Sequence, residues 1–269
     1  MKLLVSSVQD LDGTSFSIKT RYPRCSIFAM SVHKAGSSLF DSIIESICHR
    51  ASLPYCDFAP QMFTQGISDR QLSTETAHVL DQPSVVFSGF RGIGILPMVR
   101  NFRTGIKLLL VRDPRDIVVS LYHSVTKSHA IPEVGATREE TISQREVAKQ
   151  LSLNDFVGSG AADFPIENMR LYMDYQKSFG DMNIFKYEDI IYKKRSWVSS
   201  LSQLMSARLT SEEINEIADK HDVIPDIERP DHHIRQVHPG NFRAHLSEEN
   251  AKRLEHKYYD VFSYYEFQI

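Results

Sequence analysis

The sequence predicts an α/β fold in which a mostly parallel central sheet is flanked by helices. Short β-rich runs alternate with amphipathic helical patterns along the chain, as right-handed βαβ crossovers require. Hydrophobic residues make up 42% of the chain and charged residues 24%, which is ordinary for a packed globular protein. A length of 269 residues is within the range of one large α/β domain. We therefore expect residues 1–269 to form a single domain.

The predicted strands are short apolar runs, the pattern of strands buried on both faces. They are Ser26–Val32, Ser84–Ser88, Lys107–Val111 and Asn183–Tyr187. Ligands of parallel sheets bind beyond the carboxyl ends of the strands. The residues that directly follow these runs are therefore the first candidates for a functional site.

Helix signals follow the strands and support the alternation. They are apolar spacing at i, i+3 and i+4 from Leu39 to Ile47, an N-cap with a first-turn proline at Asp113-Pro114, a buried face from Trp197 to Leu204, a capping box at Thr210–Glu213, and a final helix near Glu248–Phe262. Two segments carry weaker signals. Residues 128–165 are expected to form an insert or lid over an acceptor site, and residues 225–245 a loop before the last helix.

The charge and cysteine content exclude several classes of protein. A formal charge of −3 gives no reason to expect a nucleic-acid or anionic-membrane partner. The thiols of Cys25, Cys48 and Cys56 are odd in number and contain no CxxC pair, which is typical of reduced cysteines. The apolar N-terminal patch meets Asp10 too early for a secretion signal, and no run is long enough to span a membrane. We expect a cytoplasmic protein.

The first candidate site is the segment His33–Phe40, which directly follows the first strand. Gly36 permits a tight turn, and successive amides at a helix start can surround an anion. Ser37 and Ser38 add hydroxyl donors, and Lys34 adds a positive charge. The pattern lacks the Walker spacing GxxxxGK[ST], because its lysine precedes its only glycine. The alternative is an ordinary strand-to-helix turn with a lysine in solvent.

The second candidate site begins at Arg112, at the carboxyl end of the third strand. Ser120 follows eight residues later (120 − 112), inside the next helix. A guanidinium that leans over the first turns of this helix could share a phosphate with the serine, since arginine suits bidentate contact with phosphate oxygens. The alternative is that Arg112 pairs with Asp113 or Asp116.

Together these motifs resemble the sulfotransferases that use 3′-phosphoadenosine 5′-phosphosulfate (PAPS). Lys34-Ala-Gly-Ser-Ser-Leu39 is similar to the 5′-phosphosulfate loop KSGTTW, and Arg112–His123 (RDPRDIVVSLYH) to the 3′-phosphate motif RNPKDVAVSYYH. Phe185–Ile190 resembles the family's YEDL segment, and Arg235–Arg243 more loosely its RKGxxGDWK loop. The motifs occur in family order over residues 26 to 243. The resemblance implies a P-loop-like sulfotransferase fold.

The resemblance also implies roles for individual residues. Lys34 would be catalytic, by contacting the bridging oxygen and stabilising charge on the leaving phosphate. The implied nucleotide-binding residues are Lys34, Ala35, Gly36, Ser37, Ser38 and Leu39 at the 5′ end, Arg112 and Ser120 at the 3′-phosphate, Tyr187 near the adenine, and Arg235 with Gly240 closing over the 3′ end. PAPS would be the donor substrate, PAP the product, and no metal is expected.

The chain departs from the family pattern at three positions. Leu39 replaces the usual tryptophan, Gln236 replaces the second basic residue of the last motif, and Phe90 lies where many members carry a catalytic histidine. The general base is therefore unassigned. Arg91 could orient an acceptor, but a guanidinium stays protonated and is a poor base. The remaining candidates are His33, His123, His129, His232, His233, His238 and Asp57.

We expect transfer of a sulfuryl group from PAPS to a hydroxyl or amine of a small molecule. The acceptor pocket is expected from the segments 56–70, 91–100 and 128–165. Two other functions stay open. One is a catalytically silent PAP- or PAPS-binding module, which Phe90 favours. The other is a P-loop-like kinase that uses ATP and Mg²⁺, against which the lysine placement argues.

Overall fold

The structure is a computed structural model, and it describes residues 4–9, 15–20, 25–67, 74–128, 130–223 and 237–268. Its centre is a five-stranded sheet with the order β4-β5-β3-β6-β7. The strands are β3 (Ile27–Ser31), β4 (Tyr55–Cys56), β5 (Val86–Phe90), β6 (Ile106–Val111) and β7 (Met182–Lys186). Every neighbouring pair is parallel. The predicted parallel α/β architecture is thus confirmed.

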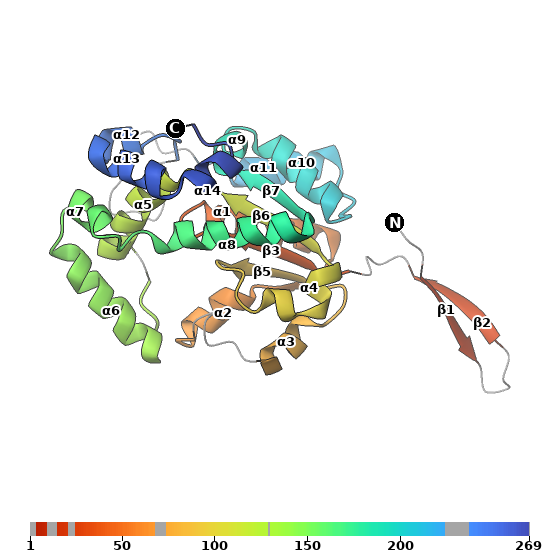
Figure 1. Cartoon of the computed structure of the whole chain (residues 1–269). Helices are drawn as coiled ribbons and strands as arrows, with labels where there is room; N and C mark the ends of the chain where they lie inside the picture. The colour runs from red at the N-terminus through yellow and green to blue at the C-terminus, as the bar shows by residue number, and fades with distance from the viewer. Residues whose placement is uncertain are drawn as a thin grey trace.

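Helices surround this sheet (Figure 1). They are α1 (Ser37–Ala51), α2 (Phe58–Thr64), α3 (Thr74–Leu80), α4 (Arg100–Thr104), α5 (Pro114–His123), α6 (Ala136–Lys149), α7 (Leu153–Gly158), α8 (Phe164–Phe179), α9 (Tyr187–Ile190), α10 (Lys194–Leu204), α11 (Ser211–Lys220), α12 (Phe242–His245), α13 (Glu248–Lys257) and α14 (Tyr259–Tyr264). The Asp113 cap and the Thr210 capping box are both present. The final helix predicted as one element is two, because the chain leaves helical geometry at Tyr258.

Two strand predictions need correction. β5 lies two residues later than the predicted run Ser84–Ser88, because Phe90 pairs with Met30 of β3 and is only 2% exposed. β4 was not predicted, since two residues carry no periodic signal, and it exists only through its pairing with β5. Because β5 ends at Phe90, the first residue that follows this strand, and so the first site candidate at this edge, is Arg91.

An N-terminal hairpin was also missed. β1 (Leu4–Gln9) and β2 (Ser15–Thr20) pair antiparallel in a separate two-stranded sheet. Figure 1 shows this hairpin beside the α/β body rather than within its sheet. The assignment of all 269 residues to one domain stays a prediction.

The core fixes the start of α1 against the sheet. β3 is buried along its whole length, and α1 buries Phe40, Ile43, Ile44 and Ile47 beneath it. From the other side, the indole of Trp197 on α10 stacks on Phe40 with ring centroids 5.5 Å apart. A helix packed on both sides cannot shift along its axis without losing apolar contact. The turn that precedes α1 is therefore held in one place.

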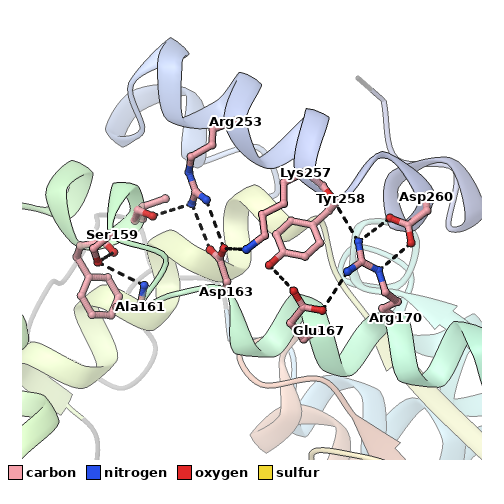
Figure 2. A network of polar contacts seen from close by, with 11 residues as sticks. Ser159, Ala161, Asp163, Glu167, Arg170, Arg253, Lys257, Tyr258 and Asp260 are labelled. Atoms are coloured by element: carbon pink, nitrogen blue, oxygen red, sulfur yellow. Dashed lines mark hydrogen bonds and ion pairs between the residues drawn. The ribbon is translucent and has the colours of Figure 1, made fainter.

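A network of charged side chains joins the C-terminal helices to α8 (Figure 2). Asp163 accepts hydrogen bonds from Arg253 and Lys257, and Arg170 binds Asp260 through two nitrogens. Burial by itself raises the pKa of the Asp163 carboxyl, but the hydrogen bonds from Arg253 and Lys257 outweigh it and lower the pKa. The network therefore fixes the positions of α13 and α14. It thereby also holds the C-terminal part of the chain, which packs against α5.

None of the described helices has both the length and the apolar character needed to cross a lipid bilayer. Residues 128–165 contain α6 and α7 and the start of α8. Their role as an insert or lid over the acceptor site stays a prediction.

Candidate functional site

The turn between β3 and α1 has the backbone of an anion-binding loop. Lys34 has φ +66° and Gly36 has φ +92°, both in the left-handed region, and the buried Ala35 lies between them. The first helical hydrogen bond runs from Phe40 N to Gly36 O, at 3.0 Å. The amides of residues 37–39 precede it, and such first-turn N–H groups have no acceptor within the helix. The helix dipole favours an anion at this end of α1.

Gly36 is required here by a close approach as well as by its φ. A Cβ at this position would lie 2.9 Å from both Cδ2 and Cε2 of Tyr187, closer than real Cβ atoms come. Tyr187 opens α9, and its hydroxyl donates to the carbonyl of Val237 at 2.8 Å. Burial raises the pKa of Tyr187 to about 12. Tyr187 therefore contacts both the loop and the C-terminal segment. Its role near the adenine stays a prediction.

Lys34 is a desolvated cation in a positive environment. Its Nζ donates to Ser124 Oγ at 3.0 Å. Burial lowers the pKa of Lys34 to about 8, and the charges of Arg91 and Arg112 add to the effect. An ordinary turn with its lysine in solvent is therefore excluded. A cation held next to other cations is stabilised by a bound anion.

Arg112 lies against the same loop and is 7% exposed. Its Nη1 donates to the carbonyl of Lys34 at 3.5 Å, and its guanidinium carbon is 4.4 Å from the centroid of the Tyr187 ring. The alternative ion pair with Asp116 is present, with 3.3 Å between Arg112 Nη2 and Oδ2. Asp113 binds Arg115 instead. Arg112 Nε is buried and has no hydrogen-bond partner in the described part of the chain, so the group retains a donor for a ligand.

Asp116 connects Arg112 with the segment around Gly240, a role that no sequence pattern indicates. Its side chain is fully buried, and its carboxylate accepts from the backbone N–H of Gly240 at 2.8 Å and of Phe242 at 2.9 Å. The predicted Gly240 therefore lies beside Arg112, although 128 residues (240 − 112) separate them in the sequence. Arg235, predicted next to it, lies outside the described residues.

The serine that contacts Lys34 differs from the one that the sequence singled out. Ser120 is half-buried in α5, and Ser124 follows it four residues later, at the start of a π-helical turn. Residues four apart share a face of a helix. Ser124 therefore lies on the same helix face as Ser120 and contacts Lys34 of the loop. The spacing i, i+4 from Ser120 is the sequence signal that could have identified Ser124.

The last residue of β5 is Phe90, and not a histidine. Phe90 is buried and stacks on Phe58 with ring centroids 5.7 Å apart. Arg91 follows it, and its Nη1 donates to Ser31 Oγ at 2.8 Å while its Nη2 donates to Asp41 Oδ2 at 2.7 Å. The histidine position of the family is thus an apolar wall, with a guanidinium at its end.

The four candidate bases in the described part of the chain have different neighbours. The His33 ring packs edge-on against Phe164, and the His123 ring against His245. Asp57 is the N-cap residue of α2, and His238 Nδ1 lies 2.5 Å from the Tyr192 hydroxyl. His129, His232 and His233 lie outside the described residues. Each assignment as a base stays a prediction.

Among the described residues, no cluster of three or more His, Cys, Asp or Glu side chains could hold a metal ion. Whether the reaction proceeds without a metal stays a prediction.

The fold is a parallel α/β fold, and Lys34, Arg91 and Arg112 gather at the carboxyl edge of its sheet. Residues 96–223 match the family profile described as the sulfotransferase domain. The predicted resemblance to the sulfotransferase family is thereby confirmed. The matched range includes Arg112, Ser120 and Tyr187 but not the loop at Lys34.

Solved structures support the same fold. A mouse sulfotransferase complexed with PAP aligns with a TM-score of 0.59 and 12% identity, over 92% of this chain and 90% of that one. Retinol dehydratase complexed with androsterone and PAP gives 0.51 and 14%, and its complex with retinol and PAP gives 0.51 and 15%. Both retinol dehydratase alignments cover 96% of this chain and 90% of the other. No curated protein sequence matches the chain.

Proposed function

We propose that this protein transfers a sulfuryl group from PAPS to a hydroxyl or amine of a small molecule and releases PAP. One observation carries the proposal: the half-buried Lys34, just before α1, lies close enough to Arg91 and Arg112 for their charges to lower its pKa. Such a cluster of cations and first-turn amides fits a ligand with several phosphate-type charges. The sulfotransferase-domain match supports PAPS as that ligand.

The loop residues would hold the 5′-phosphate of the donor. The amides of residues 37–39 and the hydroxyls of Ser37 and Ser38 would bind this phosphate, and Arg112 with Ser120 would take the 3′-phosphate. The 3′-phosphate is the group that distinguishes PAPS from ATP. The unpartnered Nε of Arg112 supports this use of its guanidinium.

In the transfer, the acceptor oxygen or nitrogen forms a bond to sulfur while the bond from sulfur to the bridging oxygen breaks. The electron pair of the broken bond stays on the 5′-phosphate of PAP. Lys34 is placed to stabilise this charge, and a fixed cation in a dry site does so at little reorganisation cost. The acceptor proton leaves to a base that is unassigned, so an amine or an acidic hydroxyl is the acceptor that this site favours.

We propose that the acceptor molecule binds at the end of β5. The half-buried Phe58 stacks on the buried Phe90, and Tyr55 forms a 2.7 Å hydrogen bond with Ser88 on the same strand as Phe90. This combination suits a small apolar molecule with one polar group. The structures of retinol dehydratase hold acceptor-sized molecules of this kind, androsterone and retinol.

A second candidate function is a silent PAP-binding module. Phe90 in the histidine position favours it, because loss of a general base typically costs ~10²–10⁴-fold in rate. We also propose a cytoplasmic location, which the free thiols of Cys25, Cys48 and Cys56 support.

Calorimetric titration with PAP and with ADP, each with and without Mg²⁺, tests the nucleotide site. We expect metal-independent PAP binding and much weaker ADP binding. Arg112→Ala should abolish PAP binding, whereas Arg50→Ala, which removes an exposed ion pair with Glu216, should not. Stronger ADP binding that depends on Mg²⁺ would instead support the kinase. A screen of acceptor alcohols, phenols and amines, with Lys34→Met as the inactive control, then separates the enzyme from the binding module.

A further inference from the structure

Two arginines flank the segment that runs from β3 through the loop into α1. In the sheet, β5 and β6 are the two neighbours of β3, and each is followed directly by an arginine, Arg91 and Arg112. Arg91 donates to Ser31 at the end of β3, and Arg112 donates to the carbonyl of Lys34 in the loop. The sequence motifs include Arg112 as a nucleotide contact. They assign no such contact to Arg91.

The donor molecule has anionic groups on both sides of its 5′-phosphate. The ribose and the 3′-phosphate extend to one side, and the sulfuryl group extends to the other. If the 5′-phosphate lies on the loop and the 3′-phosphate lies on the Arg112 side, the sulfuryl group points towards the β5 side. Arg91 is the arginine on that side.

We propose that Arg91 binds the non-bridging oxygens of the sulfuryl group, and that Asp41 is the residue that positions its guanidinium. This inference rests on the proposed function. A guanidinium has five N–H donors. The hydrogen bonds to Ser31 and Asp41 use two of them, and the side chain is 22% exposed, so donors remain for a ligand.

Asp41 is suited to positioning because it is itself fixed. It lies on α1, whose apolar face is buried, and its side chain is 15% exposed. Its Oδ2 binds Arg91, and its Oδ1 is buried without a hydrogen-bond partner among the described residues. A buried carboxylate with one cationic partner holds that partner strongly, since separation would leave the charge uncompensated.

Arg91 stabilises negative charge on the sulfuryl oxygens and accepts no proton. During the transfer, the sulfur–oxygen bond to the phosphate breaks with its electron pair on PAP, and the new bond forms to the acceptor. The acceptor proton leaves to solvent or to a base, because the guanidinium stays protonated throughout. Arg91 fixes the direction of the sulfuryl group and stabilises the negative charge on its oxygens.

The test compares PAP with PAPS, which differ only in the sulfuryl group. Both are titrated by calorimetry against the wild type, Arg91→Gln, Arg91→Lys, Asp41→Asn and the control Arg50→Gln. The titrations are made at pH 6.5, below the pKa of Lys34, because removal of Arg91 would otherwise change the Lys34 charge. Thermal unfolding is recorded for every variant.

We expect Arg91→Gln to weaken PAPS affinity about 10- to 100-fold, as the loss of a charge-assisted hydrogen bond predicts, and to weaken PAP affinity clearly less. Asp41→Asn should shift PAPS affinity in the same direction by less, and Arg91→Lys should restore part of it. The control should match the wild type for both ligands.

Equal weakening of PAP and PAPS in Arg91→Gln, or no change in either, would overturn the proposal and leave Arg91 a structural residue. Arg91→Lys keeps a cation next to Asp41, so it provides the same comparison should the glutamine variant unfold. A wild-type protein that binds neither PAP nor PAPS would overturn the proposed function itself, which is a different result.

Discussion

The low pKa of Lys34 predicts that PAP binding takes up a proton from solution. In the unliganded protein this pKa is about 8, because of burial and the charges of Arg91 and Arg112. A bound phosphate favours the charged ammonium and raises the pKa. At pH 9, only about a tenth of the free protein carries a charged Lys34. Binding should therefore take up close to one proton, about 0.9 per PAP.

The sign of the pH dependence follows from the same values. PAP affinity should be nearly constant between the phosphate titration near pH 6 and about pH 8, and should fall by about tenfold per pH unit above that, until the pKa of the complex is reached. Phosphate groups of PAP titrate near pH 6 and do not contribute in this window. Tyr187, with a pKa of about 12, titrates above it.

Calorimetry in two buffers of different ionisation enthalpy measures the proton uptake directly. Lys34→Met should bind PAP weakly with no uptake at pH 9, and Lys252→Met, which removes an exposed lysine paired with Glu248, should keep the wild-type uptake. Wild-type binding at pH 9 without proton uptake, or uptake that persists in Lys34→Met, would refute the assignment of Lys34 to the phosphate site.

Three further predictions concern the supports of the site. Gly36→Ala should cost about 1–3 kcal/mol in unfolding free energy and abolish PAP binding, because its Cβ meets the Tyr187 ring at a positive φ. Asp116→Asn should lower stability by about 2–4 kcal/mol in urea unfolding, since the buried carboxylate accepts two backbone N–H groups. Asp163→Asn should lower the free energy of unfolding at neutral pH. It should also remove the part of the loss of stability in acid that protonation of Asp163 causes, as urea unfolding at several pH values would show. The pKa of Asp163 is lowered below 3.8, so its contribution is present above about pH 4 and is lost as the pH falls through the folded value.

The site was partly visible in the sequence because its motifs are local. Lys34, Gly36 and the two serines are close in the chain, and the turn they form depends on φ values and helix-start chemistry that local sequence specifies. The end of β5 was placed too early, since pairing with β3, rather than composition, extends the strand through Gly89 to Phe90.

The residues that the sequence missed act through contacts between distant segments. Asp116 binds amides near residue 240, and Ser124 binds Lys34 from 90 positions away. Arg91 meets Asp41 across 50 residues. No periodicity or spacing reports such partners, because they are set by the order of the strands and the packing of helices on the sheet.

The sequence by itself determined the α/β class, the phosphate loop and the arginine at the end of β6, because these follow from period, turn chemistry and short motifs. The tertiary structure decided the charge state of Lys34 and the second arginine beside it. Both depend on which strands flank β3, and the strand order is fixed only when the buried faces of the sheet and its helices are packed together.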